Sequence, residues 1–242
     1  MVDLIGIASG IAGFGPALAL LFYTLRQYTF PKVEKPYFDD RKIFAFFALG
    51  IVVGMLMFTF EAWGQTISSS NTLLFLVAGF AVMEELLKLI ILNFPRFQRK
   101  VDTAFSGVSF GLGIASTFTF ASIYSSALAI TNPQPFDFVV LGLLGLQLVL
   151  LHGSTTAYIG IGVARGQVKV YFSDALLTHL AYGLLMIPGL AENMINPTAD
   201  SAINILGLVG ASAVVLYSYS RLYRQSLPAL IWDAKRLVKT KQ

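Results

Sequence analysis

The sequence predicts an all-α polytopic membrane protein, a bundle of about seven transmembrane helices, and three observations lead to this fold class. Hydrophobic residues make up 56% of the 242 positions, charged residues make up 12%, and the mean hydropathy is +0.71. Apolar stretches of about 18 to 28 residues recur, and a helix of that length crosses a hydrocarbon core of about 30 Å. Only helices and closed barrels satisfy their backbone hydrogen bonds in lipid, and stretches this long favour helices.

These stretches predict one membrane domain, residues 1–222, followed by a basic cytoplasmic tail, residues 223–242. The expected spans are residues 3–25, 43–63, 72–93, 104–130, 136–164, 171–190 and 202–222. The first span has no basic region before it and no small-residue cleavage site, so we expect it to be retained rather than removed as a signal peptide. Prolines in the connection that follows it argue against a continuous helix there.

The distribution of lysine and arginine predicts the orientation of the bundle. Basic residues follow the first, third and fifth spans and fill the C-terminal tail, whereas the connections "GQTISSSN", "TNPQPFD" and "AENMINPTAD" have none. By the positive-inside rule the N-terminus is outside and the C-terminus is cytoplasmic. Of the 17 basic residues, Lys88 alone departs from this pattern.

The composition also limits the partners of the protein. The sequence pI near 9.3 follows from this topology and needs no nucleic acid to explain it. The basic tail, with Trp232 as an interface anchor, predicts attraction to anionic lipid, so the lipid bilayer is one expected partner. Cysteine is absent, which excludes disulfides, thiolate metal sites and a cysteine nucleophile. The sequence does not predict an oligomeric state.

Three ionisable residues lie inside the third span, in "FAVMEELLKLIIL", residues 80–92. Carboxylates in hydrocarbon cost several kcal/mol each unless they find partners. Lys88 follows Glu84 by four residues and Glu85 by three, so it can partly neutralise either one. Two carboxylates and one ammonium still leave negative charge, and a second cation, a proton or a metal is needed.

The two histidines of the chain, His152 and His179, also fall within predicted spans. Counted from the cytoplasmic ends of their helices, both histidines and Glu85 lie roughly 12 to 18 Å deep. A single buried histidine is more often a hydrogen-bonded core residue, and the acid pair with Lys88 could be an interhelical ion network. Because all these groups share one layer, we expect a functional site instead.

These groups suit hydrolysis. A glutamate paired with imidazole can deprotonate water, and His152, His179 and Glu85 could instead hold Zn²⁺ with an open position for water. The sequence leaves open whether zinc or no metal is used. A serine nucleophile is less suitable, because Ser154 follows His152 by two residues and faces elsewhere. Proton- or ion-coupled transport also uses glutamate, lysine and histidine at this depth and stays open.

The order "EELLK", "DTAFSGVSFGLGIAS", "LHGSTTAYIGIGVARG" and "LTHLAYGLLM" resembles the PrsW-type intramembrane proteases, relatives of the CAAX prenyl endopeptidases. The resemblance implies an integral protein of a prokaryotic cytoplasmic membrane that cleaves a membrane-embedded protein or peptide. The catalytic residues that it implies are Glu84, Glu85, His152 and His179. Lys88 would support them, Asp102 matches an aspartate before the glycine-rich helix, and Tyr182 fits an aromatic position after the second histidine.

The chain departs from the family pattern at two positions. Phe118 stands where the family usually has an acid followed by an amide, and Gly183 stands where it has Asn or Asp. A polar side chain is thus missing twice, and four others could compensate: Thr117, Thr119, Asp174 and Tyr182. The departures keep a second interpretation open, a catalytically weakened homologue that binds a membrane peptide or lipid.

Overall fold

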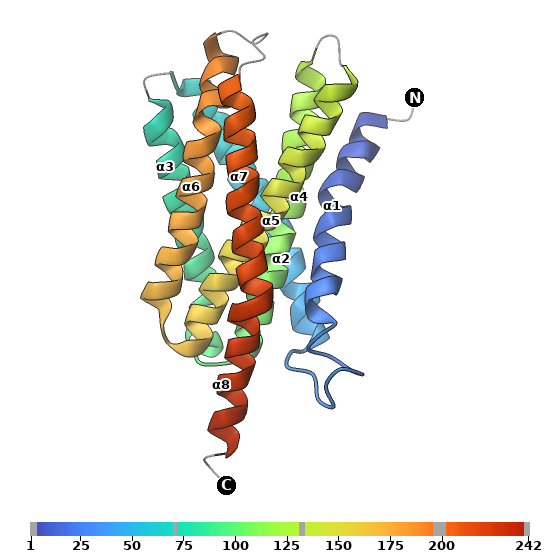
Figure 1. Ribbon diagram of the computed structural model, residues 1–242, viewed down its shortest axis with the longest axis vertical. Coiled ribbons are helices and arrows are strands. Elements are labelled where there is room, and N and C mark those ends of the chain that lie inside the picture. Colours follow the sequence, from blue (N-terminus) through green and yellow to red (C-terminus); the bar gives the residue numbers. More distant parts are fainter. Residues whose placement is uncertain (1–3, 70–71, 131–133, 196–201, 240–242) are drawn as a thin grey trace.

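The computed structural model describes residues 4–69, 72–130, 134–195 and 202–239 as a bundle of long helices (Figure 1). Their bounds are α1 Leu4–Leu25, α2 Asp40–Ile67, α3 Leu73–Leu92, α4 Asp102–Ala129, α5 Pro135–Arg165, α6 Val168–Ile195, α7 Ala202–Arg221 and α8 Leu227–Lys239. The described residues contain no strand. The predicted all-helical fold is confirmed, and each of the seven expected spans coincides with one of α1 to α7. Parts of the three connections without basic residues, and the last three residues of the tail, lie outside the described residues.

Six helical stretches in the described part of the chain are long and apolar enough to cross a membrane. They are Leu4–Leu25, Asp40–Ile67, Asp102–Ala129, Pro135–Arg165, Val168–Leu190 and Ile203–Arg236. The remaining long helix, α3, has 20 residues, about 30 Å at 1.5 Å per residue, which also matches a hydrocarbon core. It differs from the six because every 18-residue stretch within it contains Glu84, Glu85 and Lys88. The chain is therefore an integral membrane protein built as a helical bundle.

The centre of the bundle is α4, in which every side chain from Thr103 to Ser116 is buried. α1, α2 and α5 pack against it. A methyl group at Gly107 would lie 2.8 Å from the carbonyl oxygen of Thr156, and one at Gly111 would overlap the carbonyl oxygen of His152. The glycines thus bring the backbones of α4 and α5 into contact, as their clustering in the sequence predicts.

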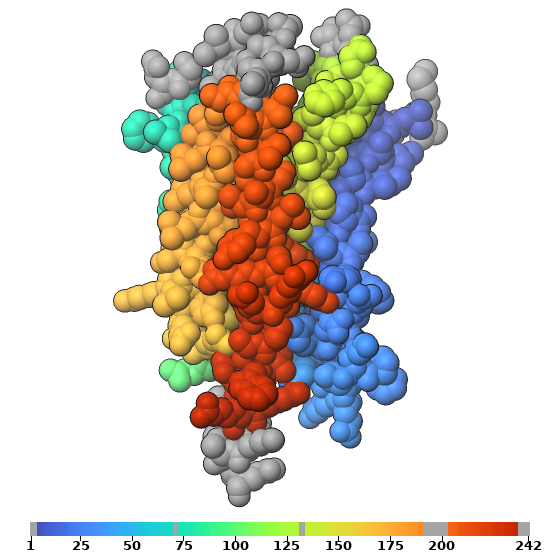
Figure 2. Space-filling model, viewed as in Figure 1, coloured from blue at the N-terminus to red at the C-terminus, as the bar shows by residue number. Residues whose placement is uncertain are grey.

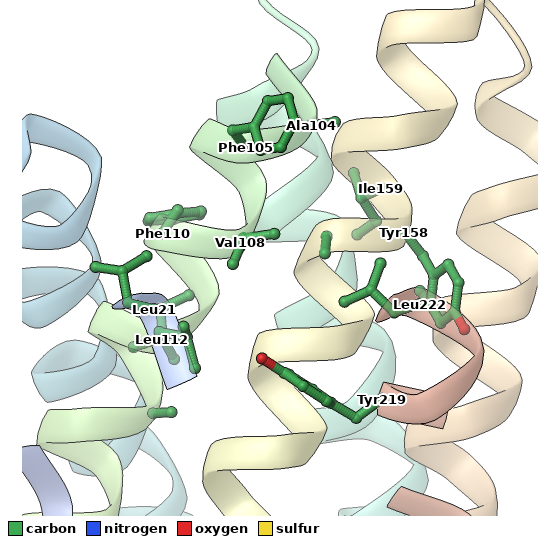
Figure 3. Packing of buried hydrophobic residues seen from close by; sticks show 14 of the residues in the cluster. Leu21, Ala104, Phe105, Val108, Phe110, Leu112, Tyr158, Ile159, Tyr219 and Leu222 are labelled. Atoms are coloured by element: carbon green, nitrogen blue, oxygen red, sulfur yellow. The ribbon is translucent and has the colours of Figure 1, made fainter. Parts of the chain in front are cut away.

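Apolar side chains from several helices fill the core around α4 (Figure 3). Phe105 and Phe110 of α4 are fully buried, as is Ile161 of α5. Hydrogen bonds cross between helices in the same region: the Tyr158 hydroxyl donates to the carbonyl oxygen of Ser218 over 2.9 Å. Because lipid tails are as apolar as these side chains, packing and hydrogen bonds rather than burial from water hold such helices together.

α5 joins two groups of helices. On one side it packs on α4, and on the other it contacts α6 and α7, with α3 packed on α6 (Figure 1). Its first turn has Pro135 and a capping box between Gln134 and Asp137, and it ends at Gly166, whose φ of 71° is the left-handed cap conformation. His152 lies in the middle of this helix and therefore near both groups.

The C-terminal segment continues α7 rather than leaving it as an irregular tail. A π-helical turn, Leu222–Ser226, joins α7 to α8, and Figure 1 shows α8 extending beyond the bundle at the end where the α1–α2 connection lies. Leu227, Leu230 and Ile231 of α8 are buried. The 14 residues between α1 and α2 contain no α-helix, as their prolines predict.

Candidate active site

Lys88 is the centre of a buried polar cluster made by α3, α5 and α6. Its Nζ donates to Glu85 Oε1 over 2.6 Å, to Thr155 Oγ1 over 3.3 Å, and lies 3.1 Å from His152 Nδ1. The lysine is 0% exposed, yet its three ammonium protons have three acceptors, so its burial costs no hydrogen bond. Of the two acids that the sequence offers to Lys88, the structure pairs it with Glu85.

The contact with Lys88 fixes the tautomer of His152. An ammonium only donates, so Nδ1 of the ring accepts and the ring proton lies on Nε2. The ring is 1% exposed, and Phe118 packs against it with the two ring centroids 5.4 Å apart. His152 is thus held on one face by an aromatic ring and at one nitrogen by a cation, with Nε2–H as its donor.

His179 is oriented by the same acid that binds Lys88. Its Nδ1 lies 2.7 Å from Glu85 Oε1, and a carboxylate that accepts from Nδ1–H leaves Nε2 as the second functional nitrogen. Nε2 lies 4.0 Å from Glu84 Oε2. The rings of His152 and His179 meet edge to face with centroids 5.6 Å apart. Glu85 therefore joins α3 to α6 and aims the His179 ring toward Glu84.

Glu84 differs from its neighbour Glu85 because neither of its oxygens makes a hydrogen bond of normal geometry among the described residues, and the side chain that interacts with it from α2 is another acid, Glu61. Its Oε2 lies 3.7 Å from His152 Nδ1 and 4.0 Å from His179 Nε2, beyond a normal hydrogen bond. The side chain is 1% exposed. A buried carboxyl group next to a second acid and two imidazoles is a candidate for a reactive acid.

Glu61 of α2 is a third acid of the site, and the sequence analysis missed it. Its side chain interacts with Glu84 and with Lys88, and Tyr182 of α6 lies within electrostatic range of it. The signal for Glu61 was present in the sequence, because it is the only ionisable residue between Lys42 and Glu84. An ionisable residue inside a span is a functional candidate by default.

The two departures from the family pattern have structural explanations. Phe118 fills its position with a ring that contacts His152 and also meets Phe58 edge-on, with those two centroids 5.7 Å apart. At Gly183 a Cβ would lie 2.7 Å from a methyl carbon of Val77, so the glycine lets α6 approach α3. Both positions are thus used for apolar packing between helices.

Three of the four residues expected to compensate have other partners. Thr117 donates to Ile51 O over 2.9 Å, Thr119 to Gly145 O over 3.4 Å, and Asp174 pairs with Arg221 over 3.1 Å. The fourth, Tyr182, is buried beside Glu61. Glu61 therefore brings a further carboxyl group to Glu84 from a different helix, α2.

Two further residues of the sequence analysis lie away from the cluster. Asp102, at the start of α4, pairs with Lys42 over 2.6 Å, and the two side chains are 23% and 47% exposed. Ser154 donates to Leu151 O and accepts from Ser218 of α7, so it faces away from His152 as expected. The structure brings together Glu84, Glu85, Lys88, His152 and His179, and their catalytic roles stay predictions.

The cluster does not fit the tentative zinc ligands His152, His179 and Glu85. Zinc needs three protein ligands around one point, and no group of three His, Asp or Glu side chains in the described part of the chain is arranged to hold a metal ion. The Lys88 ammonium itself lies between Glu85 Oε1 and His152 Nδ1. A cation of the protein thus already bridges two of the three groups that zinc would bridge.

Comparisons with known proteins add no assignment. The chain matches no family model, no curated protein and no solved structure. The fold and the cluster described above are therefore the observations on which function must be argued.

Proposed function

We propose that the protein is an intramembrane peptidase that hydrolyses a membrane-embedded protein or peptide with water activated by Glu84. One observation carries the proposal: the buried Glu84 carboxyl group, whose side-chain neighbour on α2 is another acid, lies within 4.0 Å of two imidazoles on other helices. Carboxylate and imidazole groups at such distances are suited to general acid–base catalysis through one water. The resemblance to PrsW-type proteases points to the same reaction and to a prokaryotic cytoplasmic membrane.

Glu84 acts as the general base in this proposal. A water between Glu84 Oε2 and His179 Nε2, which are 4.0 Å apart, reaches both groups. Glu84 takes a proton from this water as its oxygen bonds to the carbonyl carbon of the scissile peptide. The proton then passes from Glu84 to the leaving nitrogen as the carbon–nitrogen bond breaks, giving a carboxylic acid and an amine and returning Glu84 to its starting state.

The other residues position these groups. His152 donates its Nε2–H to the oxyanion that forms on the carbonyl oxygen. Glu85 and Lys88 hold the rings of His179 and His152, each by the Nδ1 atom. Glu61 is the acid next to Glu84 on the side of α2. This route uses a metal at no step, because the cluster does not fit one.

Orientation in the membrane is part of the same proposal. The lysine and arginine distribution supports an external N-terminus and a cytoplasmic C-terminus. His179, at 8% exposure, is the most exposed histidine of the cluster, compared with 1% for His152.

The test is cleavage by reconstituted protein. Wild type, Glu84→Gln and the control Glu34→Gln, which changes an exposed glutamate outside the cluster, are incubated with a panel of membrane peptides, and products are identified by mass spectrometry. We expect cleavage by the wild type and by Glu34→Gln but none by Glu84→Gln. Cleavage by Glu84→Gln at the wild-type rate would refute the proposed role.

A weakened homologue is the second candidate, and it is favoured by Phe118, whose ring covers His152 where the family has an acid. Such a protein would keep the fold and bind a membrane peptide or lipid without hydrolysis. It predicts that the wild type binds peptides of the panel and cleaves none. Any cleavage that depends on Glu84 would exclude it.

A further inference from the structure

A groove lies between α8 and the α1–α2 connection, and none of its lining residues belongs to the polar cluster. It has a volume of about 550 Å³ and is lined by Gln27, Tyr28, Val33, Tyr37, Tyr223, Pro228, Ile231, Trp232 and Lys235. Figure 2 shows the two segments side by side at the lower end of the molecule, α8 in red and the connection in blue. Two segments about 200 positions apart thus form one binding surface.

One face of α8 lines this groove. Pro228, Ile231, Trp232 and Lys235 occupy positions i, i+3, i+4 and i+7, so they share one side of the helix. The opposite side of α8 faces the end of α5, where Asp233 pairs with Arg165 over 2.7 Å. This ion pair and the buried Leu227 and Leu230 agree with an orientation of α8 in which Trp232 and Lys235 face the α1–α2 connection.

The groove has a buried base and an exposed rim. Tyr28 is 8% exposed and Ile231 is 7% exposed, whereas Trp232 is 70% exposed. Burial raises the pKa of Tyr28 to about 12, so its hydroxyl stays a hydrogen-bond donor at neutral pH. Aromatic walls that end in hydroxyl groups, with a lysine at the rim, suit a ligand with apolar and anionic parts.

Positive charge surrounds the groove on the connection side as well. The Arg26 guanidinium lies 4.4 Å from the centroid of the Tyr23 ring, and Tyr23 stacks on Tyr223 of the groove with centroids 4.9 Å apart. Of the acids nearby, Asp233 is paired with Arg165, and Asp39 accepts from a backbone N–H at the start of α2. The connection also carries the exposed Glu34, but Arg26, Lys32 and Lys35 outnumber its acids. Lys235 and Arg26 thus favour an anionic ligand.

The level of the groove along the membrane normal indicates that the anionic ligand is a lipid headgroup. The apolar helical stretch that ends at Arg236 has 34 residues, about 51 Å at 1.5 Å per residue, whereas a hydrocarbon core is about 30 Å thick. Its last third therefore lies beyond the acyl chains, and the connection after Leu25 begins where α1 leaves them. This is the level of the lipid headgroups, where Trp and Tyr concentrate.

We propose that this groove is a binding site for the headgroup of an anionic phospholipid, with Lys235 contacting the phosphate and Trp232 and Tyr28 the glycerol and upper acyl region. The site is independent of the proposed hydrolysis. This proposal differs from general attraction of a basic tail to the membrane. It predicts that Lys235 determines the preference for anionic over zwitterionic lipid and that other lysines at the same end of the molecule do not.

The chain offers a direct reporter, because Trp63 and Trp232 are its only tryptophans. In a Trp63→Phe background, Trp232 fluorescence is measured in liposomes that contain a few per cent of brominated anionic or brominated zwitterionic phospholipid. We expect quenching to require about fivefold less of the anionic lipid, which is the effect of one lysine near an anionic surface. Lys235→Gln should abolish this difference, whereas Lys169→Gln, which changes an exposed lysine at the start of α6, should keep it.

Three outcomes would overturn the proposal. Equal quenching by both lipids would make Trp232 an interface anchor only. An unchanged preference in Lys235→Gln would mean that the whole basic surface attracts the lipid. Loss of the preference in the presence of millimolar inorganic phosphate, at constant ionic strength, would assign the groove to free phosphate. Circular dichroism of each variant confirms that it is folded before the comparison.

Discussion

Two halves of the polar cluster are built differently, although they start from adjacent residues of α3. In the Lys88 half, which comprises Lys88, Glu85 and the groups bonded to them, one ammonium and one carboxylate oxygen connect three helices through contacts of 2.6 to 3.3 Å. In the Glu84 half, which comprises Glu84 and Glu61, both oxygens of Glu84 lack a normal hydrogen-bond partner. A paired buried charge stabilises a structure, whereas an unpaired one is available for chemistry.

The difference arises from the helix geometry and from α5. Residues three and four apart are both neighbours on a helix, so α3 alone does not decide which glutamate Lys88 binds. His152 and Thr155 are three apart on α5, and both accept from Lys88. They draw the ammonium toward α5, which brings it to Glu85 and leaves Glu84 facing Glu61 of α2.

The largest expected effect comes from breaking the Lys88 half. Lys88→Met removes the partner of Glu85, His152 and Thr155 together, and breaking a buried pair from one side costs about 3 to 5 kcal/mol. We expect the free energy of unfolding in detergent micelles, measured by SDS titration, to fall by that amount. Lys169→Met, a change at an exposed lysine, should leave it unchanged. Equal stability of the two variants would show that the Lys88 half is not structural.

An intermediate effect is expected in the Glu84 half. Glu61→Gln keeps the shape of the side chain next to Glu84, but it removes the ionisable carboxyl group. We expect kcat to fall about tenfold, less than the 10² to 10⁴ of a general base, with an unchanged melting temperature. Initial rates of peptide cleavage measure this, with Glu34→Gln as the control. A loss as large as that of Glu84→Gln would instead make Glu61 the base.

The smallest effect is expected outside both halves, at Asp102. Its pair with Lys42 is partly exposed, and such pairs contribute about 0 to 1 kcal/mol. The free energy of unfolding of Asp102→Asn should therefore lie within about 1 kcal/mol of the wild-type value, and the variant should cleave peptides at the same rate. Loss of cleavage by folded Asp102→Asn would restore the supporting role that the family resemblance implies.

Most of the fold follows from the sequence, because length and apolarity in lipid leave few alternatives to helices. The seven expected spans match α1 to α7 within about five residues, and the glycines of α4 and α5 predict their close contact. The continuation of α7 into α8 was not predicted. A basic segment that leaves the membrane carries no strong helix signal of its own, and the contacts of Leu230 and Asp233 with the bundle are tertiary.

The sequence predicted which residues form most of the cluster, but it did not predict which of them contact one another. Charges in apolar spans mark Glu84, Glu85, Lys88, His152 and His179, since lipid makes such groups costly. The side chains that would compensate for Phe118 were sought near it in sequence, at Thr117 and Thr119. Glu61 comes from α2, about 60 residues away, and only the packing of the helices brings it to Glu84.

One paired measurement tests the central claim, that Glu84 is reactive and Glu85 structural. Glu84→Gln and Glu85→Gln change adjacent residues of one helix by the same few atoms. Melting curves and cleavage rates are recorded on the same purified samples. We predict that the free energy of unfolding of Glu84→Gln lies within about 1 kcal/mol of the wild-type value and that this variant does not cleave peptides. For Glu85→Gln we predict a free energy of unfolding lower by about 3 kcal/mol or more. A stable Glu85→Gln beside a Glu84→Gln that is destabilised yet still cleaves would contradict the account.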